Sequence, residues 1–165
     1  MELVKSENKQ VVAFEKDGSN FHQQVEYLEQ LLINSNHPDI YVGNSEHLPL
    51  THSFSDGIYT REIFIKKGMV VIGKIHKYDH TFFLLKGKLM LCTENGVKEI
   101  VAPYYGKAPS GTKRVACAME DSVFVNVHPN PENITNIEEL EEKFVVSSFE
   151  DYNKYKQLKE FVWVM

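Results

Sequence analysis

The chain lacks the features that mark exported, membrane-spanning and nucleic-acid-binding proteins. Its two cysteines, Cys92 and Cys117, form neither a disulfide framework nor a metal-ligand spacing, so we expect reduced thiols that face packed interior. No apolar run approaches the length of a membrane span, and the N-terminus has no signal-peptide core. The formal net charge of −5 argues against a nucleic-acid surface, which needs clustered Lys and Arg. These absences predict a cytoplasmic protein with neither a membrane nor a nucleic-acid partner.

What is present suits one globular domain, because 165 residues are enough to bury a sizeable core. Three zones follow one another. Residues 1–54 predict a helical and extended segment, in which 21–33 has apolar residues at helical spacing and Pro38 ends the helix. Residues 55–130 are rich in strand formers and turn signals. Residues 131–165 predict helices and an apolar tail.

Short strands recur at regular spacing in the middle zone, which indicates a sandwich or a barrel. Asn95-Gly96 is a strong hairpin signal, because Asn-Gly accepts positive φ at both central positions of a turn. We expect strands over 58–65, 69–76, 81–85, 88–93, 97–101, 112–118 and 122–128.

The last zone predicts two helices. Thr135-Asn-Ile-Glu138 has the pattern of a capping box that opens a helix over 137–143, and a second helix is expected over 151–161. The tail 161–165 is too apolar to be left in water, so we expect it to dock on the barrel or on a partner chain. Together with an exposed sheet edge, this tail favours a homodimer.

Two potential metal ligands, His76 and His80, lie four residues apart in a region that otherwise predicts strands. On one straight strand their Cα atoms would be about 13 Å apart, too far to share an ion. If 77–79 form a turn instead, His76 ends one strand, His80 begins the next, and the imidazoles converge at the mouth of a hairpin. That geometry suits a divalent transition metal such as Fe, Mn, Ni or Zn.

The spacing around this pair resembles the first motif of the cupin superfamily. That motif has a glycine, later His-x-His, three or four residues, a glutamate, six residues and a final glycine. With the final glycine on Gly87, the glutamate position falls on His80, the second histidine on His76 and the first on Lys74. One ligand position therefore keeps its residue type, one holds another capable ligand and one is cationic.

The second cupin motif, Pro-x-Gly followed by two residues and a histidine, fits Pro109 and Gly111 and places Arg114 at the histidine position. The resemblance covers roughly residues 55–128. It implies a mainly β double-stranded β-helix, or jelly-roll barrel, here with an N-terminal helix and C-terminal helices. The chain also resembles uncharacterised cupin-like bacteriophage proteins, which implies the host cytoplasm as its location.

A metal held by two histidines alone is held weakly, so a third ligand has to come from Asp79, His128 or elsewhere in the barrel. His128 ends the last strand beside Pro129, where it is either this third ligand or a residue that hydrogen-bonds at the rim.

Lys74 and Arg114 suggest a different kind of site. If both point into the barrel, they need an anionic partner, such as the carboxylate or phosphate of a ligand, which Arg114 could hold bidentately. The alternatives are an internal salt bridge to Glu62 or Asp79, or a Lys74 that reaches out to solvent.

Aromatic residues could line the same pocket. Tyr59, Tyr78 and Phe83 are candidates, although aromatic residues in strands usually belong to the core.

Three functions stay open at this point. The favoured one is a barrel whose mouth binds a small polar or anionic molecule, with or without a His-coordinated divalent metal. The first alternative is a metal-dependent enzyme, for which the cupin resemblance implies isomerase, lyase or oxygenase chemistry. The second is a non-catalytic structural or assembly subunit of a phage.

Overall fold

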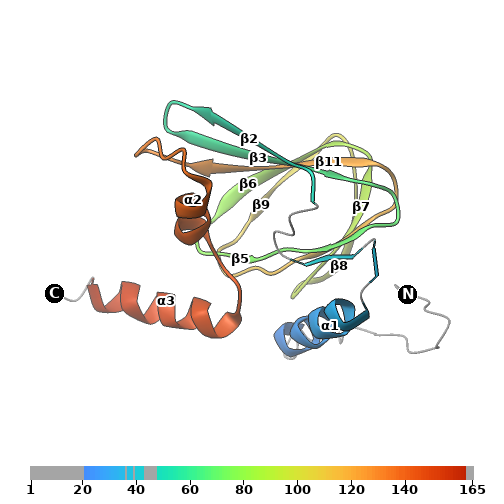
Figure 1. The fold of residues 1–165 in the computed structure, drawn as a ribbon, viewed down its shortest axis with the longest axis horizontal. Helices are drawn as coiled ribbons and strands as arrows, with labels where there is room; N and C mark the ends of the chain where they lie inside the picture. Colours follow the sequence, from blue (N-terminus) through green and yellow to red (C-terminus); the bar gives the residue numbers. More distant parts are fainter. Residues whose placement is uncertain (1–20, 36, 39, 43–47, 163–165) are drawn as a thin grey trace.

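The computed structural model describes residues 21–35, 37–38, 40–42 and 48–162. These residues form three helices and twelve strands, most of which belong to two sheets that face each other (Figure 1). The elements are α1 (Phe21–Ser35), β1 (Ile40–Val42), β2 (Leu50–Ser55), β3 (Ile58–Ile65), β4 (Val70–Ile72), β5 (Ile75–His76), β6 (His80–Lys86), β7 (Lys88–Thr93), β8 (Gly96–Val101), β9 (Tyr104–Ala108), β10 (Val115–Ala118), β11 (Ser122–Pro129), α2 (Ile137–Phe144), β12 (Val145–Val146) and α3 (Phe149–Val162).

The strand order identifies the barrel as a double-sheet jelly roll. One sheet has the order β2-β3-β11-β6-β9 and the other β1-β4-β10-β7-β8. All neighbours are antiparallel except β1 and β4, which are parallel. The chain crosses repeatedly from one sheet to the other, so most consecutive strands of the two sheets lie in opposite sheets; the hairpins β2–β3 and β7–β8 are the exceptions. The prediction of a mainly β jelly roll with an N-terminal helix and C-terminal helices is confirmed.

The core lies between the sheets and follows from the two-residue period of the strands. Along β6, Phe82 and Leu84 are buried while Thr81 and Leu85 are exposed. Ile65, Leu89, Leu91, Ile100 and Phe124 belong to the same cluster of buried side chains.

The segment predicted as one strand over 69–76 is broken at Gly73 and Lys74. Gly73 donates its backbone N–H to the Arg114 carbonyl at 3.0 Å, which connects this bend to the start of β10. The turn over 77–79 and the strand ends at His76 and His80 are as predicted. The hairpin is not, because β5 pairs with β12 and β6 pairs with β9 and β11.

Two smaller predictions are wrong by one residue. In the β7–β8 turn, Glu94 and Asn95 occupy the central positions and only Gly96, at φ 98°, has positive φ. The cap of α2 is Asn136, whose Oδ1 accepts from the Glu139 N–H at 3.0 Å, and not Thr135. Both differences leave the helix and the strands where the sequence placed them.

Helix α1 packs on the outer face of the second sheet. Phe21, Val25 and Leu28 contact Ile72, Cys92 and Val115. The contact also contains an ion pair of 2.5 Å between Glu29 of α1 and Lys113, whose side chain is 1% exposed. Cys92 and Cys117 are both free thiols, as expected.

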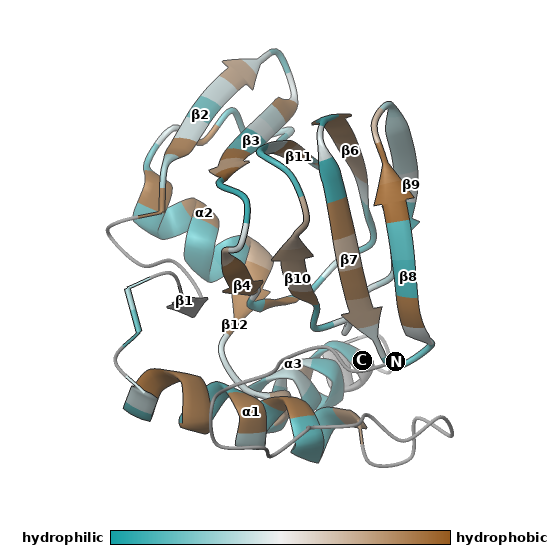
Figure 2. Ribbon diagram, turned by 90° about the vertical axis from the view of Figure 1, so that its right-hand side faces the viewer, coloured by the Kyte–Doolittle hydropathy of each residue, from teal (hydrophilic) through white to brown (hydrophobic). Residues whose placement is uncertain are grey.

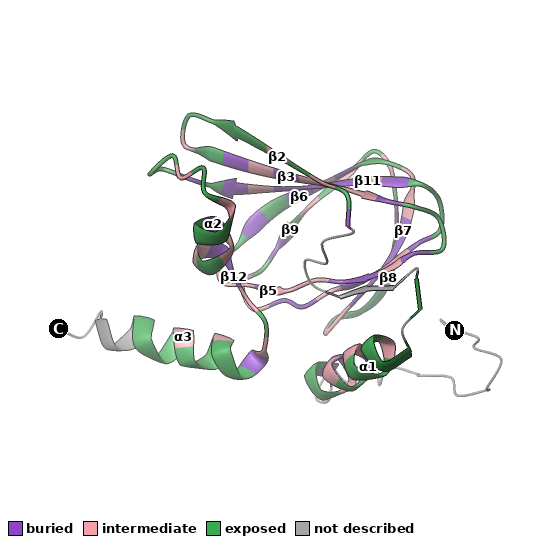
Figure 3. Cartoon of the chain, viewed as in Figure 1, coloured by how far each residue is buried: buried purple, intermediate pink, exposed green. Residues whose placement is uncertain are grey.

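Helix α2 covers one end of the barrel and continues into β12 and α3 (Figure 1). Leu140 and Phe144 of α2, with Val145, pack against Tyr59. Most of α3 is exposed (Figure 3), and it meets α1 where His22 stacks on Phe149 at 3.4 Å between ring centroids. Residues 163–165 lie outside the described part, so the docking of the apolar tail stays a prediction.

None of the helices in the described ranges is long and apolar enough to cross a membrane.

Candidate metal and anion site

Three histidines converge at the end of the barrel that α2 covers. His128 of β11 pairs with Tyr59 of β3, and His80 of β6 lies one step beyond the Val127–Thr81 pair, so both side chains point into the barrel. His76 comes from the end of β5. The ring centroids are 4.1 Å apart for His76 and His80, 4.7 Å for His80 and His128, and 5.2 Å for His76 and His128. One ring nitrogen of each lies within 4.8 Å of the others.

All three imidazoles are neutral near pH 7. Burial, followed by the positive charge of Arg114, lowers the pKa of His80 to about 4. Burial lowers the pKa of His128 to about 3, and repulsion from Arg61 and from His80 in its protonated form adds to this effect. Burial, followed by the charges of His80 and Arg114, holds the pKa of His76 well below its ordinary value. Neutral imidazole is the form that binds a transition metal.

Two of the imidazoles have a buried nitrogen that makes no hydrogen bond to the described residues. Nδ1 of His76 and Nδ1 of His128 are buried, and neither has a hydrogen-bond partner among the described residues. Since buried polar atoms are normally satisfied, these two nitrogens fit a missing ligand such as a metal ion.

The third imidazole already has partners. Nδ1 of His80 lies 3.5 Å from the Tyr78 carbonyl, and Nε2 lies 3.1 Å from both Nη2 of Arg114 and Oδ1 of Asn126. Nε2 therefore faces a donor and an acceptor at the same distance: it accepts from Arg114 when the ring hydrogen is on Nδ1, and it donates to Asn126 when the hydrogen is on Nε2. A metal ion at Nε2 would have to displace the Arg114 hydrogen bond.

The Arg114 guanidinium is buried without a carboxylate contact among the described residues. Nη2 also approaches Asn126 Oδ1 at 3.4 Å, and the group lies over the rings of Phe82 and Phe124 at 5.0 and 5.5 Å. Nη1 is buried and has no hydrogen-bond partner within the described part of the chain. Burial lowers the pKa of Arg114 to about 10, against the opposing charge of Glu94, so the side chain stays cationic at neutral pH.

A carboxylate from α2 closes the mouth next to these groups. Glu141 accepts from Arg61 Nη1 at Oε1 and from Lys74 Nζ at Oε2, both at 2.9 Å. The partner of Lys74 is therefore Glu141, and neither Glu62 nor Asp79, the two carboxylates that the sequence offered as alternatives. Because Arg61 and Lys74 belong to the barrel, the two ion pairs fasten α2 to it.

Replacing Glu141 with Gln is expected to destabilise the protein by about 2 kcal/mol, between the values for exposed and buried ion pairs, because two cations lose their carboxylate. The measurement is urea unfolding followed by circular dichroism. The matched control is Glu142→Gln, an exposed neighbour in the same helix, for which a change within about 0.5 kcal/mol is expected. Equal losses in the two variants would contradict the role given to the Glu141 ion pairs.

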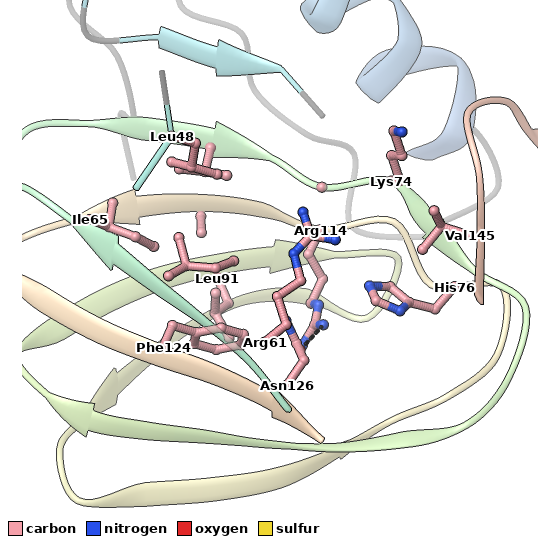
Figure 4. A pocket seen from close by; sticks show the side chains of 14 residues that line it. Leu48, Arg61, Ile65, Lys74, His76, Leu91, Arg114, Phe124, Asn126 and Val145 are labelled. Atoms are coloured by element: carbon pink, nitrogen blue, oxygen red, sulfur yellow. Dashed lines mark hydrogen bonds between the residues drawn. The ribbon is translucent and has the colours of Figure 1, made fainter. Parts of the chain in front are cut away.

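A cavity of about 70 Å³ lies between the sheets at this end (Figure 4). Its apolar side is formed by Leu48, Ile65, Leu91 and Phe124. Its polar side is formed by Arg61, Lys74, His76, Arg114 and Asn126. This division resembles a ligand pocket in which a few polar groups fix orientation.

Several other residues that the sequence singled out do not line this cavity. Tyr59 is buried behind His128 and hydrogen-bonds His52 at 2.8 Å. Tyr78 is exposed and packs on Phe144 and Tyr155. Asp79 is also outside, because its carboxylate pairs with Lys107 at 2.5 Å and accepts from the Ser110 N–H.

Sequence reasoning missed Asn126, Arg61 and Glu141. Asn126 and Arg61 had a usable signal, because each is two residues from an inward-facing position, His128 and Tyr59, and the strand period is two. The register pairs them directly, Asn126 with Arg61. Glu141 had no such signal, since only the docking of α2 brings it to the barrel.

The strand order of the two sheets, with Arg114 just before β10 and the histidines on β5, β6 and β11, puts all these groups inside a double-stranded jelly roll. The chain has a double-stranded jelly-roll fold. No protein-family model matches the sequence, and no curated protein matches it.

Solved structures to which the chain is similar include KdgF from Halomonas sp., with a TM-score of 0.45, 15% identity, and coverage of 52% of this chain and 82% of that one. A cupin superfamily protein from Desulfitobacterium hafniense has a TM-score of 0.44 and 10% identity, and the match covers 52% of this chain and 80% of that one. An acetylacetone dioxygenase from Acinetobacter johnsonii has a TM-score of 0.44 and 20% identity, and the match covers 53% of this chain and 66% of that one. Likeness at this level concerns the barrel alone and assigns no residue a role. The resemblance to bacteriophage proteins stays a prediction.

Proposed function

We propose that this protein binds a small anionic molecule inside the barrel, with Arg114 as its main contact. One observation carries the proposal: a buried guanidinium has no carboxylate contact, and one of its nitrogens, Nη1, has no partner among the described residues. A buried cation is costly unless it is paired, and a carboxylate or phosphate is the partner that a guanidinium fits best.

The charges around the first cavity support this proposal. Arg61, Lys74 and Arg114 are three cations, and Glu141 is the carboxylate that contacts two of them. The histidines add no charge, because their pKa values are lowered. Among these cations Arg114 is the one without a carboxylate contact in the described residues, and an anion would complement it.

Thermal unfolding in sodium phosphate, sulfate and formate, against chloride at equal ionic strength, tests the proposal. At ten times the Kd, binding stabilises the wild-type protein by about 1.4 kcal/mol, which raises the Tm by about 3–6 °C. Arg114→Met is expected to lose this response, and Lys67→Met, which removes an exposed cation, is expected to keep it. The proposal fails if no anion stabilises the wild type, or if Arg114→Met responds equally.

A divalent transition metal at His76, His80 and His128 is a second candidate function. It is supported by a separate observation, the two unpartnered Nδ1 atoms beside a third neutral imidazole. Three imidazoles would leave coordination positions open, and a metal there would act as a Lewis acid on a bound anion. Arg114 and Asn126 would then orient that anion.

The hydrogen bond between Arg114 and His80 makes the metal candidate testable with the same variant. Because a metal must displace Nη2 from His80 Nε2, Arg114→Met is expected to bind Zn²⁺, Mn²⁺, Fe²⁺ or Ni²⁺ at least tenfold more tightly than the wild type. Calorimetric titration of the chelator-treated proteins measures the affinities. His76→Ala in the Arg114→Met background should abolish binding. Metal binding that survives His76→Ala would place the ion elsewhere.

A further inference from the structure

A second and larger cavity lies on the other side of Arg114. It has a volume of about 200 Å³ and opens between β8 and β9, the edge strands of the two sheets. These strands stand beside β7 at one side of the molecule (Figure 2). Arg114 and Leu91 line both cavities, so one guanidinium separates them.

The wall of this second cavity is mainly apolar and partly aromatic. Phe82, Leu91, Ile100 and Tyr104 line it. The wall is closely packed at β9, because a Cβ atom on Gly106 would lie 2.8 Å from the Phe82 ring. A surface of this kind contacts the flat or compact apolar body of a small molecule.

Around the second cavity, cations outnumber carboxylates by one. Lys98, Lys107 and Arg114 line it. Lys107 is paired with Asp79, and Glu94 is the carboxylate whose charge acts on Arg114, so three cations face two carboxylates. Lys98 donates to the Tyr104 hydroxyl at 2.7 Å and lies over its ring, without a carboxylate contact in the described structure.

We propose that this cavity binds a monocarboxylic acid with a flat apolar body, its carboxylate at Arg114 and its body against Tyr104 and Ile100. The inference rests on the proposed function, because it takes Arg114 as the anion contact, and it adds the class of ligand and the side of entry. Lys98 lines the same cavity without a carboxylate contact among the described residues, so it adds a second positive charge near the bound carboxylate. A ring of six carbons, with the carboxylate attached, suits a cavity of this size and lining.

The experiment compares benzoate, formate and benzamide by calorimetric titration. Formate has the carboxylate without the ring, and benzamide has the ring without the charge. Benzoate is expected to bind the wild type at least tenfold more tightly than either. Arg114→Met is expected to weaken the binding of benzoate at least tenfold.

A cavity-filling substitution separates the body of the ligand from its carboxylate. Thr93 lines the second cavity and does not line the first. Thr93→Phe is therefore expected to weaken the binding of benzoate at least tenfold and the binding of formate less than twofold. Thr93→Leu is a milder variant if the larger one does not fold. Thr81→Phe is the matched control, because Thr81 is exposed on β6, and it should bind both anions as the wild type does.

The outcomes separate the two proposals. The inference is overturned if benzoate binds no more tightly than formate. It is also overturned if the affinity for benzoate is unchanged in both Thr93→Phe and Thr93→Leu. The proposed function then still stands if phosphate, sulfate or formate stabilises the wild type but not Arg114→Met. If neither benzoate nor a small anion binds the wild type, both proposals fail.

Discussion

Replacing Gly87 with alanine is expected to destabilise the protein by about 4 kcal/mol, from about 1–2 kcal/mol for the left-handed conformation and about 1–3 kcal/mol for overpacking. Gly87 joins β6 to β7, where the chain passes from one sheet to the other, at φ 84°. An added Cβ would lie 2.4 Å from the Asp121 carbonyl oxygen and 2.8 Å from Ser122 Cα. These are backbone atoms and cannot turn away as a flexible side chain can.

The position is also held by hydrogen bonds. The Ala102 N–H donates to the Gly87 carbonyl at 2.9 Å, and the Lys88 N–H donates to the hydroxyl of Ser122, which is fully buried. A shift of Gly87 would therefore disturb the start of β11 and the end of β8 together. A loss of this size is a large fraction of the stability of an ordinary domain, about 5–15 kcal/mol.

Gly68→Ala is the matched control. Gly68 has nearly the same φ, 87°, but an added Cβ would meet nothing within 4 Å. Only the conformational cost remains, so a loss of about 1–2 kcal/mol is expected. Urea unfolding of both variants measures the difference. Equal losses would show that the close approach to Asp121 does not matter.

Acidification is expected to destabilise the metal-free protein strongly, through His76, His80 and His128. In the unfolded chain these side chains take up protons near pH 6.5, whereas in the fold burial and the charge of Arg114 keep their pKa values at about 4 for His80, about 3 for His128 and well below the ordinary value for His76. The unfolded state therefore binds more protons, and stability falls as the pH is lowered.

The loss between pH 6.5 and 5 is on the order of 1.5 kcal/mol for each of His80 and His128, or about 3 kcal/mol for the two, and His76 adds to it in the same direction. It continues toward the folded-state pKa values. Urea unfolding in the presence of a chelator, at intervals from pH 7 to 5, gives the slope. His128→Leu removes one proton-binding group and is expected to lower the slope near pH 5 by about 1.4 kcal/mol per pH unit. An unchanged slope would mean that His128 is not held neutral in the fold.

Much of the fold could be predicted because its strands obey local rules. Period-two alternation and turn residues placed β3, β6, β7, β8 and β11 close to their observed limits. Strand β9 has no such signal, because Pro103 and Pro109 flank it and prolines at this spacing indicate turns. The β5–β12 pair could not be predicted, since it joins residues 75–76 to 145–146 and depends on how α2 docks.

The site could be predicted in part. His76 and His80 were indicated by their spacing, and Arg114 by the resemblance to the second cupin motif; the structure brings all three together with His128. The hydrogen-bond partners of His80 could not be inferred, because Tyr78, Arg114 and Asn126 come to it from the 77–79 turn, from the segment before β10 and from β11, respectively.

The pairing of β12 with β5 also determines how small a working fragment of this protein can be. Val145 pairs with His76, and Phe144 stacks on His128 with ring centroids 4.7 Å apart. A fragment that stopped after β11 would keep every strand of the two sheets and all three histidines. It would nevertheless open those histidines to water on the side that α2 covers. The shortest piece that retains a dry histidine pocket therefore extends to Val146.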